Sequence, residues 1–430
     1  MNPKVTVILT SYNKPTTVGM AVESVINQTL PDWELFIMDD ASNAETRSIL
    51  QKYLQDKRIT YINSEIKNED RYKTTRYATL INEAISKSTG KYLTYLTDDN
   101  LYERTRLEKM SDYLDKYPDR DIVYSKQKVR FIDLNGKCTS EMIRNTKGVL
   151  SKPQNLVDHC SVMHTRNILK KVQKRYGSYW DDDPINWHNA DAAFWGRLAS
   201  IGPFHPLDVV LDICMKSPTS FQQLNAFLPK TIPNGTLIKG LSGKVYLVDD
   251  QKRREIDSNM FSILRYKQNK IVQVPDPVLY RFPESDPIDK AVFHDSWKFP
   301  SGRLVKEKNM PPIYYIESNK KRHIVNQKAF KKLNFHVGDI IEVSREFLDG
   351  FQVGTPLTAT FTGDKQLPEG FPFKYGQKLF VSHDGLLHSL HPKVAAKLNF
   401  TAKQFVALNH QEYKLFKKGN SFEWKIKHWK

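Results

Sequence analysis

The sequence predicts an α/β domain with a mostly parallel, doubly wound sheet, followed by three small α+β repeats. Three observations lead to this prediction. Short apolar strands and amphipathic helices alternate through the first hundred residues. A Pro- and Ser-bearing segment, residues 218–234, is typical of a linker. Beyond it, similar segments recur at a period of roughly 65 to 69 residues.

The alternation begins at residues 5–9, a β-branched apolar run typical of a buried parallel strand. Later strands are expected at 33–38, 59–62, 92–96, 121–124 and 129–133. Helices are expected at 16–27, 44–54, 75–86, 104–116 and 190–201. A βαβαβαβ order of this kind predicts a sheet covered by helices on both faces. No Gly-x-Gly-x-x-Gly follows the first strand, and no Walker loop is present, which disfavours a dehydrogenase or a P-loop enzyme.

The predicted domains are 1–217 for the α/β domain, 218–234 for the linker, and 235–301, 302–369 and 370–430 for the repeats. Residues 235–239 recur as 302–306 and, more weakly, as 370–374. Each copy continues with a hairpin, a helical stretch that ends in an aromatic residue, and an apolar strand. Modules of this kind usually bind or assemble, and none of them pairs a nucleophile with a base.

Charge is spread unevenly along the 430 residues, whose formal net charge is +17. Residues 1–217 hold 31 Lys and Arg against 28 Asp and Glu, and the remainder holds 34 against 20. The basic rear half favours a polyanion such as an acidic polysaccharide, an anionic lipid surface or nucleic acid. A surface that is merely well solvated fits equally well.

Cellular location is expected to be the cytoplasm. No apolar stretch is long enough to span a membrane, and the N-terminus runs straight into a strand pattern. The three cysteines are odd in number and widely spaced, which suits a reducing compartment. A peripheral position at the inner face of the membrane is left open.

Polar residues follow three predicted strands: residues 10–13 after the first, Asp39 and Asp40 after the second, and Asp98 and Asp99 after the fourth. These strand ends should line one edge of the sheet and share one ligand. Adjacent buried carboxylates repel each other, and a hard divalent cation such as Mg2+ or Mn2+ relieves the conflict. A nucleotide diphosphate with its metal fits such an edge. Each group alone could equally be a turn or capping residue.

The residues that follow the strands, with their neighbours, resemble the inverting glycosyltransferases of family 2, which have the GT-A fold. The resemblance covers about the first 215 residues and leaves out the three repeats. Within the family it is strongest to glycosyltransferases of spore coat polysaccharide biosynthesis. The motifs that carry it lie at residues 5–14, 28–29, 33–42, 73–78, 98–99, 158–164, 177–181, 191 and 194–195.

The resemblance implies a role for each matching residue. Thr10, Tyr12 and Asp40 would contact the nucleoside, with Asp39 beside them, and Arg71 would lie near the nucleotide. Asp98 would contact the ribose, and Asp99 would bind Mn2+ or Mg2+. Asp191 would be the catalytic base. The family often has Glu-Asp at this last position, whereas this chain has Ala190-Asp191, and a helix N-cap is the alternative role for Asp191.

These residue types suit an inverting transfer from a nucleotide-diphosphate sugar to a saccharide acceptor. A base takes the acceptor's hydroxyl proton, and a cation stabilises the charge on the departing diphosphate. UDP and dTDP are not distinguished, because both bases offer the same N–H to a carboxylate. A surface polysaccharide is the expected product, and the basic repeats would bind an anionic glycan, a membrane surface or a partner protein.

Other functions fit less well. An inactive, glycan-binding scaffold has only the Ala190 departure in its favour. A sugar-phosphate nucleotidyltransferase would need a Gly-rich loop that residues 10–17 lack. Nucleic-acid binding by the rear half is the weakest alternative.

Overall fold

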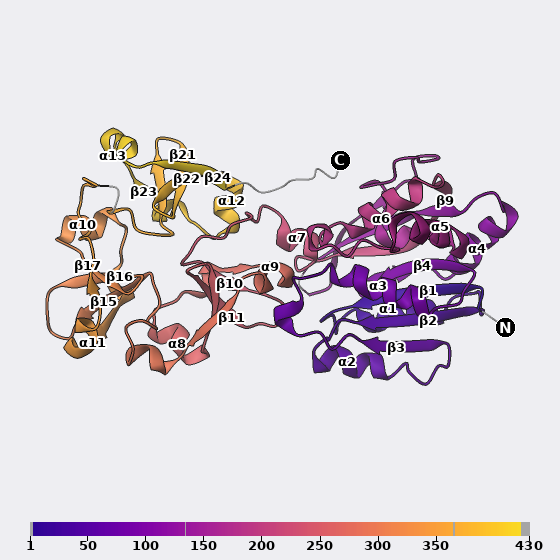
Figure 1. Ribbon diagram of the computed structural model, residues 1–430, viewed down its shortest axis with the longest axis horizontal. Helices are drawn as coiled ribbons and strands as arrows, with labels where there is room; N and C mark the ends of the chain where they lie inside the picture. The colour runs from indigo at the N-terminus through magenta and orange to yellow at the C-terminus, as the bar shows by residue number, and fades with distance from the viewer. Residues whose placement is uncertain (1–2, 134, 364–365, 423–430) are drawn as a thin grey trace. The chain divides into compact units, whose positions relative to one another are not determined.

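The computed structural model describes residues 3–133, 135–363 and 366–422 (Figure 1). The chain divides after Ser220 into two compact units. Residues 423–430, which the sequence assigns to the third repeat, lie outside the described residues. The described part contains no helix long and apolar enough to cross a membrane.

The first unit is built on one mixed sheet, which has nine strands among the described residues. Its strands are β1 Val5–Ser11, β2 Trp33–Asp39, β3 Ile59–Asn63, β4 Tyr92–Thr97, β5 Asn100–Tyr102, β6 Ile122–Ile132, β7 Cys138–Arg144, β8 Val162–Thr165 and β9 His205–Lys216. Its α-helices are α1 Val18–Ile26, α2 Ala44–Gln51, α3 Arg76–Lys87, α4 Arg106–Lys116, α5 Arg166–Tyr176 and α6 Ala190–Ala199. Short 3-10 helices span Asn68–Asp70, His159–Ser161 and Pro184–Asn186.

The sheet order is β3-β2-β1-β4-β8-β6-β9-β5, with β7 beside β6. Strands β1 to β4 are parallel, whereas β8 runs antiparallel to both β4 and β6. Alternate residues of β1 enter two different cores, because successive side chains of a strand point to opposite faces. Val5, Val7 and Leu9 pack with α1, α2 and α4, and Ile8 packs with α3, α5 and α6. The doubly wound α/β class predicted from the sequence is confirmed.

One strand differs from the expectation. The sequence predicts separate strands at 121–124 and 129–133, and the structure has the single strand β6. Two of the polar residues between them, Ser125 and Gln127, are buried because they have hydrogen-bond partners. Ser125 and Gln127 donate to the Asp212 carboxylate at 3.2 and 2.5 Å, and the buried Arg106 lies 3.5 Å from the same group. Hydrogen-bonded polar groups can be buried at little cost, so the strand continues through them.

The second unit begins with the short helix α7 Phe221–Asn225, inside the expected linker, and continues with three similar sheets. The first contains β10 Leu237–Lys239, β11 Val245–Asp249, β12 Lys252–Ile256, β13 Ile271–Gln273 and β14 Glu284–Ile288. The second contains β15 Arg303–Glu307, β16 Ile313–Glu317, β17 Lys320–His323, β18 Ile340–Val343 and β19 Gln352–Val353. The third contains β20 Pro372–Tyr375, β21 Lys378–His383, β22 Leu386–Leu390, β23 Val406–Ala407 and β24 Lys418–Phe422.

The strand order is equivalent in the three sheets: β13-β10-β11-β12-β14, β18-β15-β16-β17-β19 and β23-β20-β21-β22-β24. The helices of this unit are α8 Ser258–Ile263, α9 Asp276–Tyr280, α10 Gln327–Lys332, α11 Arg345–Asp349, α12 Pro392–Lys397 and α13 His410–Leu415. Shorter 3-10 turns span Gln268–Lys270, Lys290–Phe293, Val337–Asp339 and Ala402–Gln404.

The repeats share their hydrophobic cores. One core joins Leu247 of the first repeat to Ile316 of the second, and another joins Leu304 of the second to Phe373 of the third. Each repeat therefore depends on its neighbour for burial, as expected of modules too small to fold alone.

Candidate active site

Polar side chains meet at the carboxyl ends of β1, β2 and β4. Strand β1 lies between the other two, and the register places Ser11 beside Asp39 and Thr10 beside Thr97. The main-chain N–H of Tyr12 donates to Asp98 Oδ2 at 2.7 Å, which joins the end of β1 to the end of β4. The three strand ends named from the sequence therefore form one edge of the sheet.

Asp40 is paired with two arginines. Arg71 Nη1 lies 2.5 Å from Asp40 Oδ2, and Arg76 donates to Oδ1 from Nε and Nη2 at 3.0 and 2.8 Å. The guanidinium of Arg71 also lies over the ring of Tyr12, 4.0 Å from its centroid. The side chains of Asp40 and Arg71 are 7% and 4% exposed, so this ion pair is almost fully desolvated. The structure thus brings together Tyr12, Asp40 and Arg71, three of the residues expected near the nucleotide.

Asp39 is fully buried and is hydrogen-bonded on both oxygens. Its Oδ2 accepts from the hydroxyl of Tyr61 at 2.8 Å, and its Oδ1 accepts from the main-chain N–H of Ser42 at 3.2 Å. The Ser42 contact closes the turn that follows β2, and the Tyr61 contact joins β2 to β3. The contact of Asp39 with a nucleotide stays a prediction.

Asp98 and Asp99 form the acidic end of this edge. Burial, and then the charge of Asp99, raise the pKa of Asp98 to about 7. Asp99 Oδ1 accepts from Thr97 Oγ1 at 3.0 Å, and its Oδ2 lies 3.5 Å from the ammonium group of Lys14. The two neighbouring carboxylates repel each other, and a bound divalent cation would relieve this repulsion. Their oxygen atoms are the kind of ligand that a hard cation such as Mg2+ prefers.

Few protein ligands are available for such a cation. Within the described ranges, no third His, Cys, Asp or Glu lies close enough to Asp98 and Asp99 to complete a metal cluster. Mg2+ is commonly held by one or two carboxylates together with substrate phosphates and water. The pair therefore fits a cation that binds together with a diphosphate.

Asp191 lies in the first turn of α6, while Asn189 occupies the N-cap, so Asp191 does not cap the helix. Burial, reinforced by the charge of Asp158, raises the pKa of Asp191 to about 6, and Lys216 acts in the opposite direction. The start of the helix is held by Tyr77, whose hydroxyl accepts from the main-chain N–H of Ala190 at 2.7 Å. A carboxylate with this pKa is mostly ionised at pH 7 and is a stronger base than an ordinary aspartate.

Lys216, at the end of β9, connects the two acidic groups electrostatically. Burial acts to lower the pKa of Lys216, but Cys214, Asp158 and Asp99 outweigh it and raise this pKa above its usual value. Lys216 in turn lowers the pKa of Asp191. The positive charge of Lys216 is therefore felt by both the expected metal ligand and the expected base.

The sequence reasoning missed Lys14, Arg76 and Lys216. Lys14 follows the first strand end directly, and Arg76 lies inside the motif at residues 73–78, so both had a local signal. Lys216 had none, because only the pairing of β9 with β6 brings it to the site.

Two tryptophans of the motifs at residues 177–181 and 194–195 are core residues. Trp180 and Trp195 are fully buried, and the Trp180 ring stacks on Phe194 with centroids 4.4 Å apart. His159 and His164 are buried as well, and burial lowers the pKa of each to about 4. These tryptophans and histidines therefore belong to the interior of the α/β unit.

Comparison with known proteins identifies the class of the chain. Residues 6–173 match the model of glycosyl transferase family 2. The protein CgeD of Bacillus subtilis (strain 168) is 40% identical over 423 residues, which cover 98% of this chain and 96% of that protein. The uncharacterized glycosyltransferase MJ1057 of Methanocaldococcus jannaschii is 30% identical over 223 residues, covering 50% of this chain and 70% of that protein. The putative teichuronic acid biosynthesis glycosyltransferase TuaG of Bacillus subtilis (strain 168) is 34% identical over 113 residues, covering 26% of this chain and 42% of that protein.

The chain therefore belongs to glycosyl transferase family 2 and is a glycosyltransferase. Its similarity to CgeD runs through the three C-terminal repeats as well as the α/β unit.

Proposed function

We propose that this glycosyltransferase moves a sugar from a nucleotide-diphosphate donor to a saccharide acceptor, with inversion at the anomeric carbon. The observation that supports the proposal is the presence of two separate acidic groups. The first is Asp98 with Asp99 at the strand ends, and the second is Asp191 in α6, whose pKa is raised. One group suits the donor and its metal, and the other suits the acceptor.

Asp191 is the proposed general base. It would take the proton of the acceptor hydroxyl as the hydroxyl oxygen attacks C1 of the donor sugar. The C1–O bond to the diphosphate breaks in the same displacement, so no enzyme nucleophile is needed. Tyr77, through Ala190, would hold the start of α6 in place during this step.

Asp99 is the proposed ligand of Mn2+ or Mg2+, with Asp98 toward the ribose. The cation, when bound, would supply positive charge for the departing diphosphate. Lys14 and Lys216 already place cationic charge close to Asp99, and both would strengthen anion binding at this edge.

The base of the donor would lie near Tyr12, with Thr10, Asp39, Asp40 and Arg71 around it. Arg71 covers one face of the Tyr12 ring, so a stacked base would use the other face or displace the guanidinium. UDP is the donor nucleotide we favour, and dTDP remains the alternative because its base offers the same N–H.

The proposed product is a surface polysaccharide made in the cytoplasm. The likeness to TuaG, whose name refers to teichuronic acid biosynthesis, supports this class of product. The nearer resemblance to glycosyltransferases of spore coat polysaccharide biosynthesis remains a prediction.

A second candidate is a glycan-binding scaffold that has the same fold but no transferase activity. Ala190, which stands where the family often has Glu, is the observation that favours it. Nucleotide binding without transfer or donor hydrolysis would identify such a protein.

The test is turnover of a panel of UDP- and dTDP-sugars with Mn2+ by the wild type, Asp191→Asn and Asp99→Ala. We expect one or more donors to be turned over by the wild type, and both variants to lose roughly 100-fold or more in kcat. Lys174→Met, a change at an exposed lysine of α5, is the control and should match the wild type. Full activity in both aspartate variants would overturn the site assignment.

A further inference from the structure

The C-terminal unit contains a pocket of about 290 Å3 to which all three repeats contribute. Each repeat supplies the turn before its first strand together with the start of that strand: residues 234–237, 302–304 and 369–372. Each also supplies the turn after its helix, at residues 265–270, 333–339 and 398–404. The lining is therefore threefold in pattern, and the pocket exists only where the repeats meet.

The same backbone conformation builds the second of these turns in every repeat. Arg265, Asn334 and Asn399 have φ of 59, 56 and 56°, and each is followed by an aromatic residue that lines the pocket. A positive φ is uncommon for residues other than glycine and is favoured by asparagine. These aromatic residues are Tyr266, Phe335 and Phe400.

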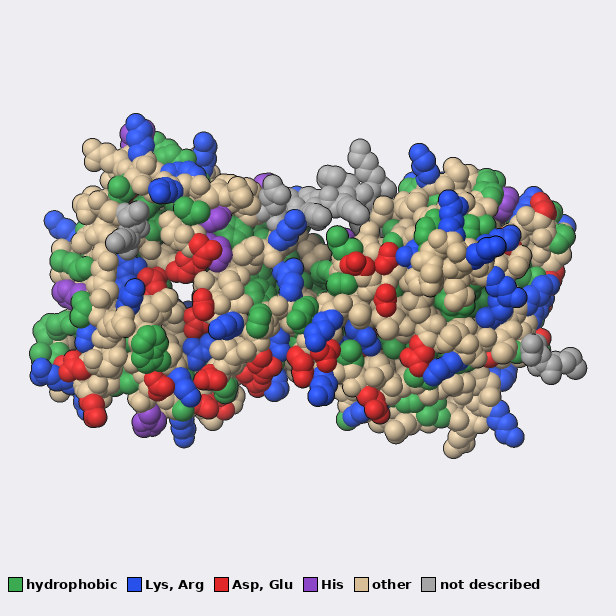
Figure 2. Space-filling model, in the orientation of Figure 1, with side chains coloured by type: hydrophobic (Ala, Val, Ile, Leu, Met, Phe, Trp, Pro, Cys, Tyr) green, Lys and Arg blue, Asp and Glu red, His purple; other side chains and the backbone are tan. Residues whose placement is uncertain are grey.

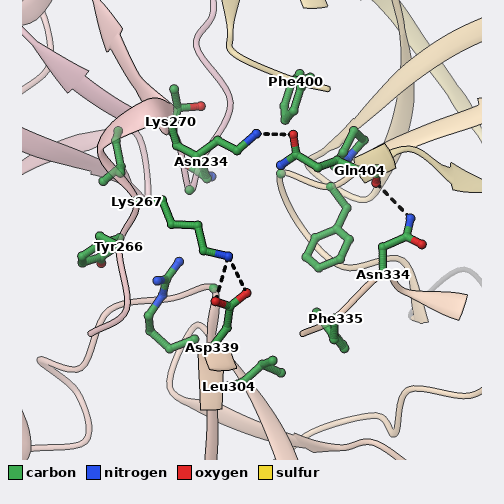
Figure 3. Close-up of a pocket in the computed structure, with 18 of the residues that line it drawn as sticks. Asn234, Tyr266, Lys267, Lys270, Leu304, Asn334, Phe335, Asp339, Phe400 and Gln404 are labelled. Atoms are coloured by element: carbon green, nitrogen blue, oxygen red, sulfur yellow. Dashed lines mark hydrogen bonds and ion pairs between the residues drawn. The ribbon is translucent and has the colours of Figure 1, made fainter. Parts of the chain in front are cut away.

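Polar contacts join every pair of repeats at the rim (Figure 3). Lys267 Nζ lies 2.9 Å from Asp339, which joins the first repeat to the second. Lys270 donates to the main-chain oxygen of Asn399 at 2.8 Å and also to Gln404, which joins the first to the third. The side-chain amide of Asn334 donates to the main-chain oxygen of Gln404 at 3.3 Å, which joins the second to the third. These contacts close a ring around the pocket.

The lining has an excess of positive charge. It contains four cationic side chains, at positions 265, 267, 270 and 303, against two carboxylates, Asp339 and Glu369. Asp339 and Lys267 neutralise each other, and Glu369 is bound by Asn234 and His383, so Arg265, Lys270 and Arg303 carry the remaining positive charge. Arg303 keeps a buried Nε for which the described residues provide no hydrogen-bond partner. The pocket is therefore suited to an anion.

On the face drawn in Figure 2, basic and acidic side chains are interspersed over the C-terminal unit, with no single basic patch. Large anionic surfaces such as membranes are bound by contiguous patches of Lys and Arg. The face drawn in Figure 2 therefore offers no such patch to a membrane.

We propose that this pocket binds an anionic sugar unit, one that carries a carboxylate or a phosphate, from a polysaccharide. Aromatic side chains give the apolar faces of sugar rings a surface to pack on, and the amides of Asn334, Asn399 and Gln404 suit sugar hydroxyls. Lysine and arginine form charge-assisted hydrogen bonds with a carboxylate or phosphate. The volume lies at the small end of ligand pockets, about 300 Å3, so it suits one or two sugar rings.

This pocket lies in a different unit from the proposed active site. Its assignment rests on the proposed function in one respect, which is that the ligand comes from a polysaccharide. The repeats would hold an anionic chain while the α/β unit extends it or a related chain. Binding is measured without donor, so its failure and a failure of turnover are separate results.

The test is isothermal titration of the full chain with tetragalacturonate, with glucose 6-phosphate, with neutral maltotetraose and with inorganic phosphate. We expect the two anionic sugars to bind at least ~10-fold more tightly than the neutral sugar and than phosphate alone. Lys270→Met, which keeps the aliphatic stem but removes the charge, should weaken binding ~10-fold or more. Lys290→Ala, at an exposed lysine outside the pocket, should leave binding unchanged.

Several results would overturn the proposal. They are no binding of either anionic sugar, equal loss in Lys270→Met and Lys290→Ala, and phosphate binding as tight as glucose 6-phosphate. Binding of the chain to phosphatidylserine vesicles but not to these sugars would instead assign the basic half to a membrane. A second variant, Asn334→Gly, tests folding separately. Glycine tolerates the positive φ of this position, so sugar binding should weaken while circular dichroism stays that of the wild type.

Discussion

The pH dependence of transfer should be set by Asp191 on its acidic side. With a pKa of about 6, this carboxylate is roughly 90% ionised at pH 7 and roughly 10% ionised at pH 5. Because only the ionised form accepts a proton, kcat/KM should fall about tenfold between these two pH values. Asp191→Asn should remove this acidic limb, the fall in kcat/KM below pH 7, and lower kcat by roughly 100- to 10,000-fold. Asp98, whose pKa is about 7, would be kept ionised by the bound cation at saturating Mn2+.

Lys216 offers a sharper version of this prediction. Its positive charge lowers the pKa of Asp191, so Lys216→Met should raise that pKa and move the acidic limb to higher pH. At pH 6 the variant should lose roughly two- to threefold more kcat/KM, relative to its own plateau, than the wild type does.

The assay is initial-rate transfer from pH 4.5 to 8.5 at saturating Mn2+, with Lys174→Met as the control of equal charge. A limb that stays in place in Lys216→Met would refute the electrostatic link between this lysine and the base. A limb that persists in Asp191→Asn would refute the assignment of the base itself.

Two further predictions concern the stability of the α/β unit. Asp40→Ala leaves two arginines without their carboxylate, one of them almost fully buried, and should destabilise the unit by about 3–5 kcal/mol. Amide hydrogen exchange of β1 to β4 should then be at least ~100-fold faster. The control is Asp112→Ala, which breaks an exposed ion pair and should change the exchange rate little. Equal effects of the two variants would contradict the stabilising role of the buried ion pairs of Asp40. Gly90→Ala would place its Cβ 2.5 Å from Thr6 Oγ1 and 2.6 Å from Thr6 N and should cost about 1–3 kcal/mol. Gly202→Ala is the control, because its added Cβ meets no atom nearer than 4.0 Å. If the two glycine variants unfold at the same temperature, the contact between residue 90 and Thr6 costs little and the prediction is wrong.

The edge of the sheet was predictable because each of its residues directly follows a strand pattern. Parallel strands place their carboxyl ends together, so Tyr12, Asp40 and Asp98 could be grouped from sequence alone. Their partners could not, since the pairing of Asp40 with Arg71 and Arg76 depends on side-chain geometry between segments 31 and 36 residues apart.

Long-range packing explains the other differences between the structure expected from the sequence and the structure observed. The polar residues 125–128 resemble a turn in sequence, but Asp212 and Arg106 provide the partners that allow β6 to run through them. The three repeats were visible as a pattern, yet their closure around a pocket depends on Lys267, Lys270 and Asn334 reaching other repeats. No local pattern encodes such contacts.

In the proposed function, the ends of β1, β2 and β4 form a metal-assisted site for a nucleotide diphosphate. Calorimetric titration of UDP into the full chain, with Mn2+ or with EDTA, measures this most directly. We expect Mn2+ to tighten UDP binding at least ~10-fold, Asp99→Ala to abolish this gain and Lys174→Met to preserve it. Equal UDP affinity with and without Mn2+, or a gain that survives in Asp99→Ala, would contradict it.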